Sequence, residues 1–422
     1  MNKLDVFEYG RLIIDDVLFT KEHWKSFVKL NEANQNAYFD VLYNGIRFKQ
    51  FVGVIQVDGL LVHIHPKADK DDSGEKWKDV LIQMLKATGR LKAQPVGDAQ
   101  LKKQHLNLLE VYFEYFLREL ELLIHRGLIK KYRKETGNVK SLKGKLEFYG
   151  NIRHNLVHKE RFYTTHQVYD VNHKLHQVLQ IALSIIDQFS KGSRIADYCK
   201  RISMSFPEMD SISVNSQVLS SIKIDRKTAP YERAFELAKL IILNYSPDIN
   251  HGNQKMIALL FDMNELWEEY VLVQLKREVN NENSPFYKQF TIQGQTRKYI
   301  WNSNFIQPDI EIVSTTTNET FIIDTKWKRP GYSASVEDLR QIYTYARFWD
   351  AKTVMLLYPG DEVQNRKGTF KTDDYSQNTL LPTAVQQIEH MGKMGFISVF
   401  DSEKANKLNT QLGAVVLEFL FD

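Results

Sequence analysis

The chain has 422 residues, and a prior of about 150 residues per domain predicts two or three domains. Apolar residues make up 43% and charged residues 26%, which is typical of a folded globular protein and excludes a disordered one. The net charge of +4 does not by itself indicate a polyanionic partner, and the single cysteine, Cys199, excludes a disulfide framework or a multi-cysteine metal site. No apolar run approaches the roughly 20 residues that span a bilayer, so we expect a cytoplasmic protein with no membrane partner.

The first part of the chain predicts short strands around one helix. Asn44-Gly45 and Asp58-Gly59 are typical of two-residue hairpin turns, and residues 61–66 alternate like a strand that ends at a proline. His63 and His65 share one face of that strand. They could bind a metal, but the sequence shows no third ligand nearby, and surface histidines on a strand are the commoner explanation.

Residues 76–128 then become helical, with an apolar stripe from Leu106 to Ile124 that we interpret as core. The stretch from Arg126 to Arg161 is strongly basic, with eleven Lys or Arg against three Glu, and aromatic side chains are interleaved with the bases. This pattern suits a nucleic acid, an acidic protein partner or a solvated face. The charge shift places a domain boundary near residue 160, giving a region 1–160 and a region 161–422.

Further apolar helices are predicted at 175–189 and 233–243. His166, His173 and His176 lie near the first of them, but no acid or cysteine stands in register for zinc, so a surface or DNA-facing role is favoured.

The region from Met256 to Tyr358 carries the chemistry. Residues 256–275 predict an amphipathic helix that bears three glutamates. Residues 305–313 and 321–328 predict a hairpin with Asp309 near the start of one strand and Asp324 on the other. A helix over 336–349 and a buried strand over 353–358 follow. The overall fold class is therefore α/β: a β-rich and helical N-terminal region, then a mixed sheet flanked by helices.

Asp309 and Asp324 predict a metal site, because two carboxylates on neighbouring strands repel each other unless a cation lies between them. Oxygen ligands favour Mg²⁺, with Mn²⁺ as the alternative. Lys326 lies two residues after Asp324 and shares its face, where it can act as a base or stabilise charge on a phosphate. The simpler explanation of the Asp324–Lys326 pair is a salt bridge at a strand end. Asp324 argues against that explanation because it follows three apolar residues, where a carboxylate is costly without a partner.

These residues resemble the PD-(D/E)xK nuclease superfamily: Pro308-Asp309, Asp324-Thr325-Lys326 and Gln341-Ile-Tyr-Thr-Tyr345. The resemblance implies that Asp309 and Asp324 bind the metal, that Lys326 assists the attacking water, and that Gln341 and Tyr345 support the site or contact the DNA backbone. It also implies a helical glutamate as a third ligand. Glu268 is the best match, and Glu265 and Glu269 remain open.

Shorter segments spread from residue 40 to 360 resemble McrC, the nuclease-subunit family of McrBC-type modification-dependent restriction systems. They are Val52-Gly53, His65-Pro66-Lys67, His125-Arg126-Gly127-Leu128, Leu142-Lys143-Gly144-Lys145 and Phe261 to Glu268. The resemblance implies an McrB-like AAA+ GTPase partner, on which the N-terminal region docks and whose GTPase it stimulates, while the C-terminal domain cuts DNA. The chain itself has no phosphate-binding loop of the Gly-x-x-x-x-Gly-Lys-Ser/Thr type.

DNA contacts are expected from Lys328, next to the acid pair, and from Lys143, Lys145 and Arg153 in the basic stretch. The leading hypothesis is a Mg²⁺-dependent DNA endonuclease subunit. A non-catalytic activator of the partner NTPase and a stand-alone RecB-like repair nuclease are the alternatives.

Overall fold

The computed structural model describes residues 2–15, 17–57, 59–66, 74–91, 107–247, 255–328, 330, 333–360, 363–370, 390–401 and 407–421. It divides the chain into two compact units. The first unit comprises Met1–Ile55, Gly59–Lys92 and Leu260–Asp422, and the second comprises Gln56–Asp58 and Ala93–Leu259. In the described ranges, no helix is both long and apolar enough to cross a bilayer.

This division differs from the expected boundary near residue 160. That residue lies between β7 (Lys131–Val139) and β9 (Phe162–Asp170), which pair as antiparallel strands along their whole length. The charge shift that suggested a boundary therefore marks a single element inside the second unit.

The first unit contains a six-stranded mixed sheet in the order β12-β15-β16-β17-β19-β18. Its strands are β12 (Phe290–Gly294), β15 (Ile310–Ser314), β16 (Thr320–Thr325), β17 (Ala351–Pro359), β19 (Met391–Ile397) and β18 (Gln364–Thr369). β15 and β16 form the predicted antiparallel hairpin, and β16, β17 and β19 run parallel. The expected mixed sheet is confirmed.

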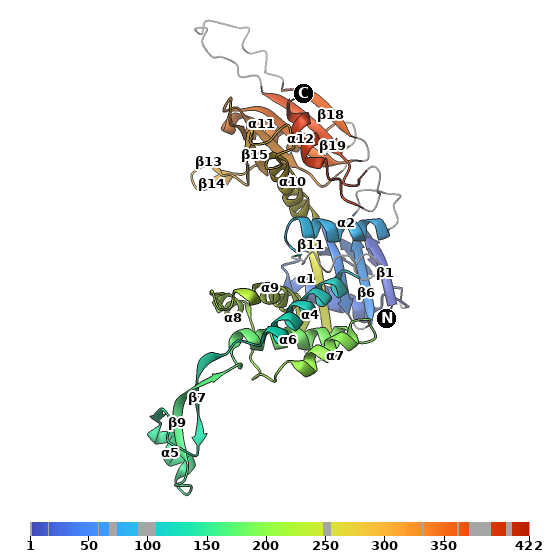
Figure 1. Ribbon diagram of the computed structural model, residues 1–422. Coiled ribbons are helices and arrows are strands. Elements are labelled where there is room, and N and C mark those ends of the chain that lie inside the picture. The colour runs from blue at the N-terminus through green and yellow to red at the C-terminus, as the bar shows by residue number, and fades with distance from the viewer. Residues whose placement is uncertain are drawn as a thin grey trace. The chain divides into compact units, whose positions relative to one another are not determined.

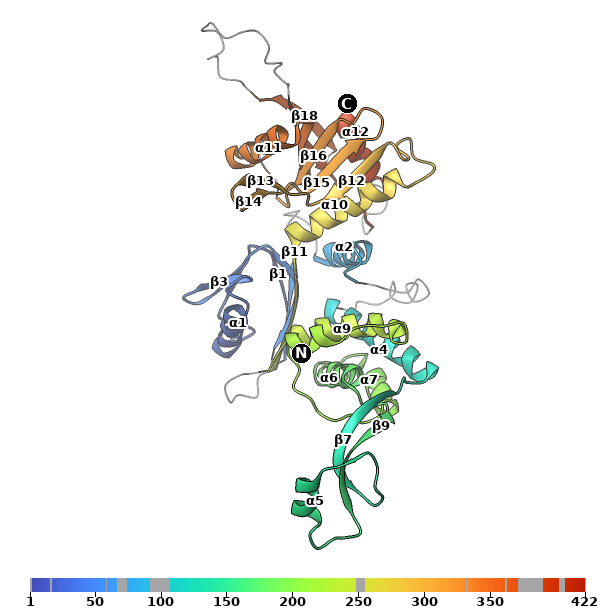
Figure 2. The same cartoon turned by 90° about the vertical axis from the view of Figure 1, so that its left-hand side faces the viewer.

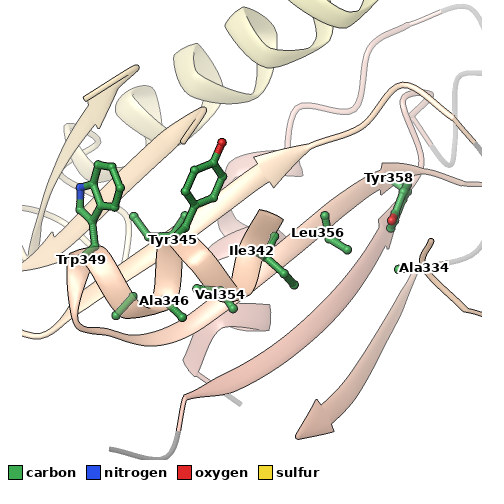
Figure 3. Close-up of a cluster of buried hydrophobic side chains, with 10 residues drawn as sticks. Ala334, Ile342, Tyr345, Ala346, Trp349, Val354, Leu356 and Tyr358 are labelled. Atoms are coloured by element: carbon green, nitrogen blue, oxygen red, sulfur yellow. The ribbon is translucent and has the colours of Figure 1, made fainter. Parts of the chain in front are cut away.

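Helices cover both faces of this sheet. The helix α11 (Val336–Trp349) packs on the face of β17 that presents Val354 and Leu356, and Figure 3 shows the buried cluster that they form. The next residue along, Leu357, points to the opposite face, beside Phe419 of α12 (Leu412–Phe421). The residues after Tyr358 thus complete the sheet with two strands and cover it with a helix.

The helix α11 begins and ends where its capping residues dictate. Ser335 caps it by accepting a hydrogen bond from the Asp338 backbone N–H, and Asp350 ends it in the left-handed conformation. These bounds match the predicted helix.

The helix α10 (Met263–Val279) starts later than the sequence pattern suggested. Residues from Lys255 to Asp262 form the strand β11, so the prediction of a helix from Met256 is wrong for this part. Asp262 caps α10 through the backbone N–H of Asn264, and the apolar run before it pairs with a neighbouring strand. A short continuous apolar run can form either a helix or a buried strand, and here its pairing with a neighbouring strand makes it a strand.

The N-terminal strands form two further sheets, as expected. A five-stranded sheet has the order β1-β6-β5-β11-β10, and a three-stranded sheet has the order β2-β4-β3. The strands are β1 (Asn2–Phe7), β2 (Arg11–Ile13), β3 (Phe39–Leu42), β4 (Gly45–Phe48), β5 (Phe51–Val57), β6 (Leu60–His65) and β10 (Tyr245–Pro247). The helices are α1 (Lys21–Ala33) and α2 (Gly74–Ala87).

The second unit is a group of helices that carries a long projection built on a three-stranded sheet. Its helices are α4 (Leu108–Arg126), α6 (Lys174–Phe189), α7 (Ala196–Ser205), α8 (Ser216–Ser221), the short 3₁₀ helix η2 (Ala229–Tyr231) and α9 (Glu232–Leu243). The apolar stripe of α4 is buried, as predicted. Figures 1 and 2 show β7 and β9 projecting from these helices, with α5 (Phe148–Asn155) near their far end. The short strand β8 (Lys145–Leu146) pairs with β9. We call residues 131–170 the arm.

Candidate active site

The two predicted acids lie where β15 and β16 meet. Asp309 immediately precedes β15, and its Oδ2 atom accepts hydrogen bonds from the backbone N–H (2.6 Å) and the hydroxyl (2.8 Å) of Thr325. Asp324, the residue before Thr325, has a fully buried side chain. Burial raises the pKa of both carboxyls, and the charge of Asp309 raises that of Asp324 further.

Lys326 is the cation of this site. Its Nζ atom lies 2.6 Å from Oδ2 of Asp324 and donates to Oε1 of Gln341 at 3.0 Å. Burial, the largest single effect, lowers the pKa of Lys326, but the carboxylates of Asp324, Asp309 and Asp338 together outweigh it and raise that pKa. Lys326 therefore stays protonated in this arrangement, which favours charge stabilisation over action as a base.

A chain of hydrogen bonds fixes the lysine from the side of α11. Gln341 donates through Nε2 to the hydroxyl of Tyr345 (2.9 Å), and that hydroxyl donates to the backbone carbonyl of Gln307 (2.9 Å). Tyr345 is buried, and Figure 3 shows it on α11 with the apolar cluster beneath that helix. Of the two expected roles, this burial favours support of the site over contact with DNA.

Three glutamates of the first turns of α10 were candidates for the same site, and their contacts separate them. Arg90 makes a bidentate ion pair with Glu269 (2.7 and 2.8 Å) and also bonds Glu265 (3.1 Å). Glu268 instead accepts a hydrogen bond from Nε2 of Gln295 at 2.8 Å. Burial, and next the charge of Asp309, raise the pKa of Glu268 to about 7. Glu268 is thus the helical acid that shares the electrostatic environment of the acid pair.

The carboxylates fit a divalent cation. Asp324 uses one oxygen for Lys326, while its Oδ1 atom is buried and has no hydrogen-bond partner among the described residues. A buried carboxylate oxygen without a partner is costly, and a hard cation is the ligand that best satisfies it. Asp309, Asp324 and Glu268 are the residues that could hold such an ion.

The sequence analysis assigned no role to two residues of this arrangement. Thr325 holds Asp309 through two hydrogen bonds, and Gln295 links Glu268 to the backbone carbonyl of Asp309, to which its N–H donates at 2.9 Å. Both act through pairings between segments that are distant in the sequence. The only indication in the sequence was the position of Thr325, whose hydroxyl lies between the aspartate and the lysine of the motif.

The lysines and the arginine that were expected to contact DNA belong to two different units. Lys328 is half exposed and pairs with Asp338 at 2.6 Å in the first unit. Lys143, Lys145 and Arg153 are exposed on the arm, which belongs to the second unit.

His63 and His65 of β6 have a third possible metal ligand beside them, Asp5, which the sequence analysis did not identify. β1 runs parallel to β6, and Asp5 is the strand partner of His63. Oδ1 of Asp5 lies 2.7 Å from Nε2 of His65 and 3.6 Å from Nδ1 of His63. The three residues have the spacing of a possible metal site, but the short Asp5–His65 contact is also an ordinary cross-strand hydrogen bond.

His173 and His176, two of the three histidines near α6, each lie against a backbone carbonyl. Nδ1 of His176 lies 2.7 Å from the carbonyl of Val171, and Nε2 of His173 lies 3.3 Å from that of Ile129. His176 is fully buried, so the expected surface or DNA-facing role is wrong for it. Burial lowers its pKa to about 4 and keeps it neutral.

A mixed α/β unit that brings two acids and a lysine together, with a helical glutamate in their electrostatic environment, has the groups that divalent-cation and phosphate chemistry would need. Comparison with known proteins gives the family. The model of the family described as "McrBC 5-methylcytosine restriction system component" matches residues 46–359. The chain belongs to this family and is a component of a McrBC-type restriction system, so the expected kinship with McrC is confirmed.

Individual relatives agree with this assignment. The Escherichia coli K12 protein "Type IV methyl-directed restriction enzyme EcoKMcrBC" is 20% identical over 283 residues, which cover 60% of this chain and 77% of the relative. A structure of Thermococcus gammatolerans McrB AAA+ hexamers with bound McrC matches with a TM-score of 0.67 and 17% identity, covering 100% of this chain and 99% of the other. A second Thermococcus gammatolerans McrBC complex matches with a TM-score of 0.49 and 20% identity over 67% of this chain and 89% of the other. The first of these structures supports the fold.

Proposed function

We propose that this protein is the metal-dependent DNA endonuclease subunit of its restriction system, with a site of the PD-(D/E)xK type. The observation that carries the proposal is the buried carboxylate of Asp324, which has one oxygen on Lys326 and the other without a partner among the described residues. A purely structural salt bridge would not need Asp309 close enough for its charge to raise the pKa of both Asp324 and Glu268.

The cofactor that suits this ligand set is Mg²⁺, with Mn²⁺ as the alternative, and Asp309, Asp324 and Glu268 would hold it. When bound, the ion would polarise the scissile phosphate and lower the pKa of the attacking water. Lys326, protonated and held by Gln341, would stabilise the negative charge that develops on the phosphoryl oxygens.

The partner that we propose is an McrB-like AAA+ GTPase ring, whose GTPase this chain stimulates. The family assignment supports this, as does the likeness to an McrC that was solved with McrB hexamers. On this chain the arm is the surface best suited to docking. It exposes a set of apolar side chains that a free surface rarely presents together. Those side chains are Phe148, Tyr149, Ile152, Leu156 and Val157.

DNA cleavage with and without the partner tests this function. Plasmid DNA is incubated in Mg²⁺ with the wild type or with Asp324→Ala, each with and without the proposed McrB-like GTPase partner and GTP. We expect cleavage by the wild type only, and only with partner and GTP. We place the activity in the cytoplasm, where such a complex would meet incoming DNA.

The other outcomes distinguish the alternatives. Cleavage by the wild type alone would indicate a stand-alone RecB-like nuclease. No cleavage in any mixture, with faster GTP hydrolysis in the presence of either version, would indicate a non-catalytic activator of the GTPase. Loss of both cleavage and partner binding in Asp324→Ala would show that Asp324 has a structural role.

A further inference from the structure

A small two-stranded sheet in the first unit exposes aromatic side chains. β13 (Lys298–Trp301) and β14 (Asn304–Ile306) form an antiparallel hairpin, which we call the aromatic hairpin. Tyr299 is 72% exposed, Trp301 71% and Phe305 46%. Large aromatic rings usually bury most of their surface in a folded protein, so their exposure on one short ribbon indicates a contact surface.

The aromatic hairpin is attached to the candidate active site at both of its ends. Before β13, Gln295 bonds Glu268 and the backbone carbonyl of Asp309. After β14, the carbonyl of Gln307 accepts from the hydroxyl of Tyr345, and its side chain accepts from Nε of Arg297 at 2.8 Å. The ribbon is therefore held in place by the same residues that build the acid–lysine site.

The length of chain between Tyr299 and the candidate active site is comparable to a few nucleotide steps of DNA. Tyr299 is four positions after Gln295, so at most about 13 Å of chain lies between them, which is the length of roughly four nucleotide steps along a strand. Figures 1 and 2 both show β13 and β14 beside β15, the strand that Asp309 precedes. A DNA strand with its phosphate at the carboxylates would thus pass within reach of the aromatic hairpin.

The charges of the aromatic hairpin favour a polyanion over a second protein surface. Residues 297–306 contain two basic side chains, Arg297 and Lys298, and no acidic one. The Arg297 guanidinium lies 4.5 Å from the ring centre of Phe305, and the Lys298 ammonium bonds the carbonyl of Phe348. Cations fixed beside exposed aromatic rings are the combination that binds phosphates and stacks on bases.

We propose that the aromatic hairpin contacts the bases of the DNA beside the phosphodiester that is cut, with Tyr299 and Trp301 stacking on them or wedging between them. This inference rests on the proposed nuclease function and adds a binding surface to it. The contact requires no sequence readout, because every base offers a ring face. It positions the strand, while the acids and Lys326 act on the phosphate.

The test measures DNA binding separately from cleavage. The full-length Asp324→Asn protein binds a fluorescein-labelled DNA duplex, and fluorescence anisotropy gives the Kd. Adding Trp301→Ala or Tyr299→Ala should raise the Kd about five-fold or more, whereas Trp301→Phe should keep most of the affinity. Tyr43→Ala is the matched control, since Tyr43 is a fully exposed aromatic residue in a turn of the same unit.

The possible results are distinct. If the parent binds the duplex and both alanine variants bind equally well, the aromatic hairpin makes no DNA contact and the nuclease proposal stands. If the parent binds no DNA, either alone or assembled with its GTPase partner and GTP, the nuclease proposal fails and this inference fails with it. If the alanine variants keep DNA binding but lose self-association in sedimentation, the surface joins two copies of the chain and the inference is overturned.

Discussion

Asp324→Asn replaces a buried carboxylate with a neutral amide of nearly the same shape. Burial, and next the charge of Asp309, raise the pKa of Asp324 from 3.8 to about 7 in the metal-free fold. Because the folded state holds this proton more tightly than the unfolded state, wild-type stability falls as the pH rises from about 4 to about 7. Three pKa units correspond to about 4 kcal/mol, which is the upper limit of the cost of ionising Asp324 in the fold.

The asparagine variant escapes this cost because it has no proton to lose. Between pH 5 and pH 8, we expect its free energy of unfolding to improve relative to the wild type by about 2–3 kcal/mol. The assay is urea unfolding in EDTA, followed by tryptophan fluorescence. All six tryptophans belong to the first unit, so the signal reports on the unit that holds Asp324.

Asp15→Asn is a control in the same unit, for which we expect stability relative to the wild type to change with pH in the opposite direction. The Asp15 carboxylate accepts hydrogen bonds from three backbone N–H groups, that of Phe19 foremost, and they lower its pKa. Its contribution to stability is present at neutral pH and is lost on acidification, so Asp15→Asn should lose stability relative to the wild type as the pH rises.

A divalent cation should stabilise the wild type relative to Asp324→Asn. Mg²⁺ is expected to raise the unfolding midpoint of the wild type at pH 8 and to leave that of Asp324→Asn nearly unchanged. The reasoning is refuted if Asp324→Asn is less stable than the wild type at pH 8 in EDTA. That result would mean that the carboxylate is fully satisfied by its ion pair and has no need of a cation.

Three further predictions concern the acid, the cation and the arm. Glu268→Gln should weaken Mg²⁺ binding measured by calorimetry, most of all above pH 7, where the wild-type carboxyl has lost its proton. Glu269→Gln should bind Mg²⁺ like the wild type, because the carboxylate of Glu269 is already paired with Arg90. Lys326→Met should lower the cleavage rate by about 10²-fold or more while the midpoint shift caused by Mg²⁺ persists, and an unchanged rate would remove the lysine from the mechanism. Phe148→Ser with Tyr149→Ser should abolish co-elution with the GTPase partner without lowering the unfolding midpoint, because both side chains are exposed; retained co-elution would place docking elsewhere.

Much of the candidate site was predictable because its signals are local. Asp309 and Asp324 follow from two strand patterns joined by a turn, and the structure pairs those strands as expected. The helix over 336–349 was predicted with its bounds, and the residues that cap it, Ser335 and Asp350, lie directly beside the segment. The acids, the lysine and the glutamine of the motif are thus a property of the sequence.

The choice among the three glutamates of α10 was decided by tertiary structure. Glu265, Glu268 and Glu269 are equivalent in local pattern, and they differ only because Arg90, some 180 residues earlier, occupies two of them. Asp5 likewise reaches His65 only through the parallel pairing of β1 with β6. No local rule specifies either contact.

The division of the chain is the largest feature that depends on tertiary structure. A charge shift near residue 160 suggested a boundary, yet β7 and β9 pair across it, and the N-terminal strands share a unit with the C-terminal sheet. Strand partners are chosen by packing and hydrogen bonding between distant segments, and composition does not record that choice. The sequence by itself determined the chemical groups of the site, whereas tertiary packing decided which acids face one another and which segments fold as one body.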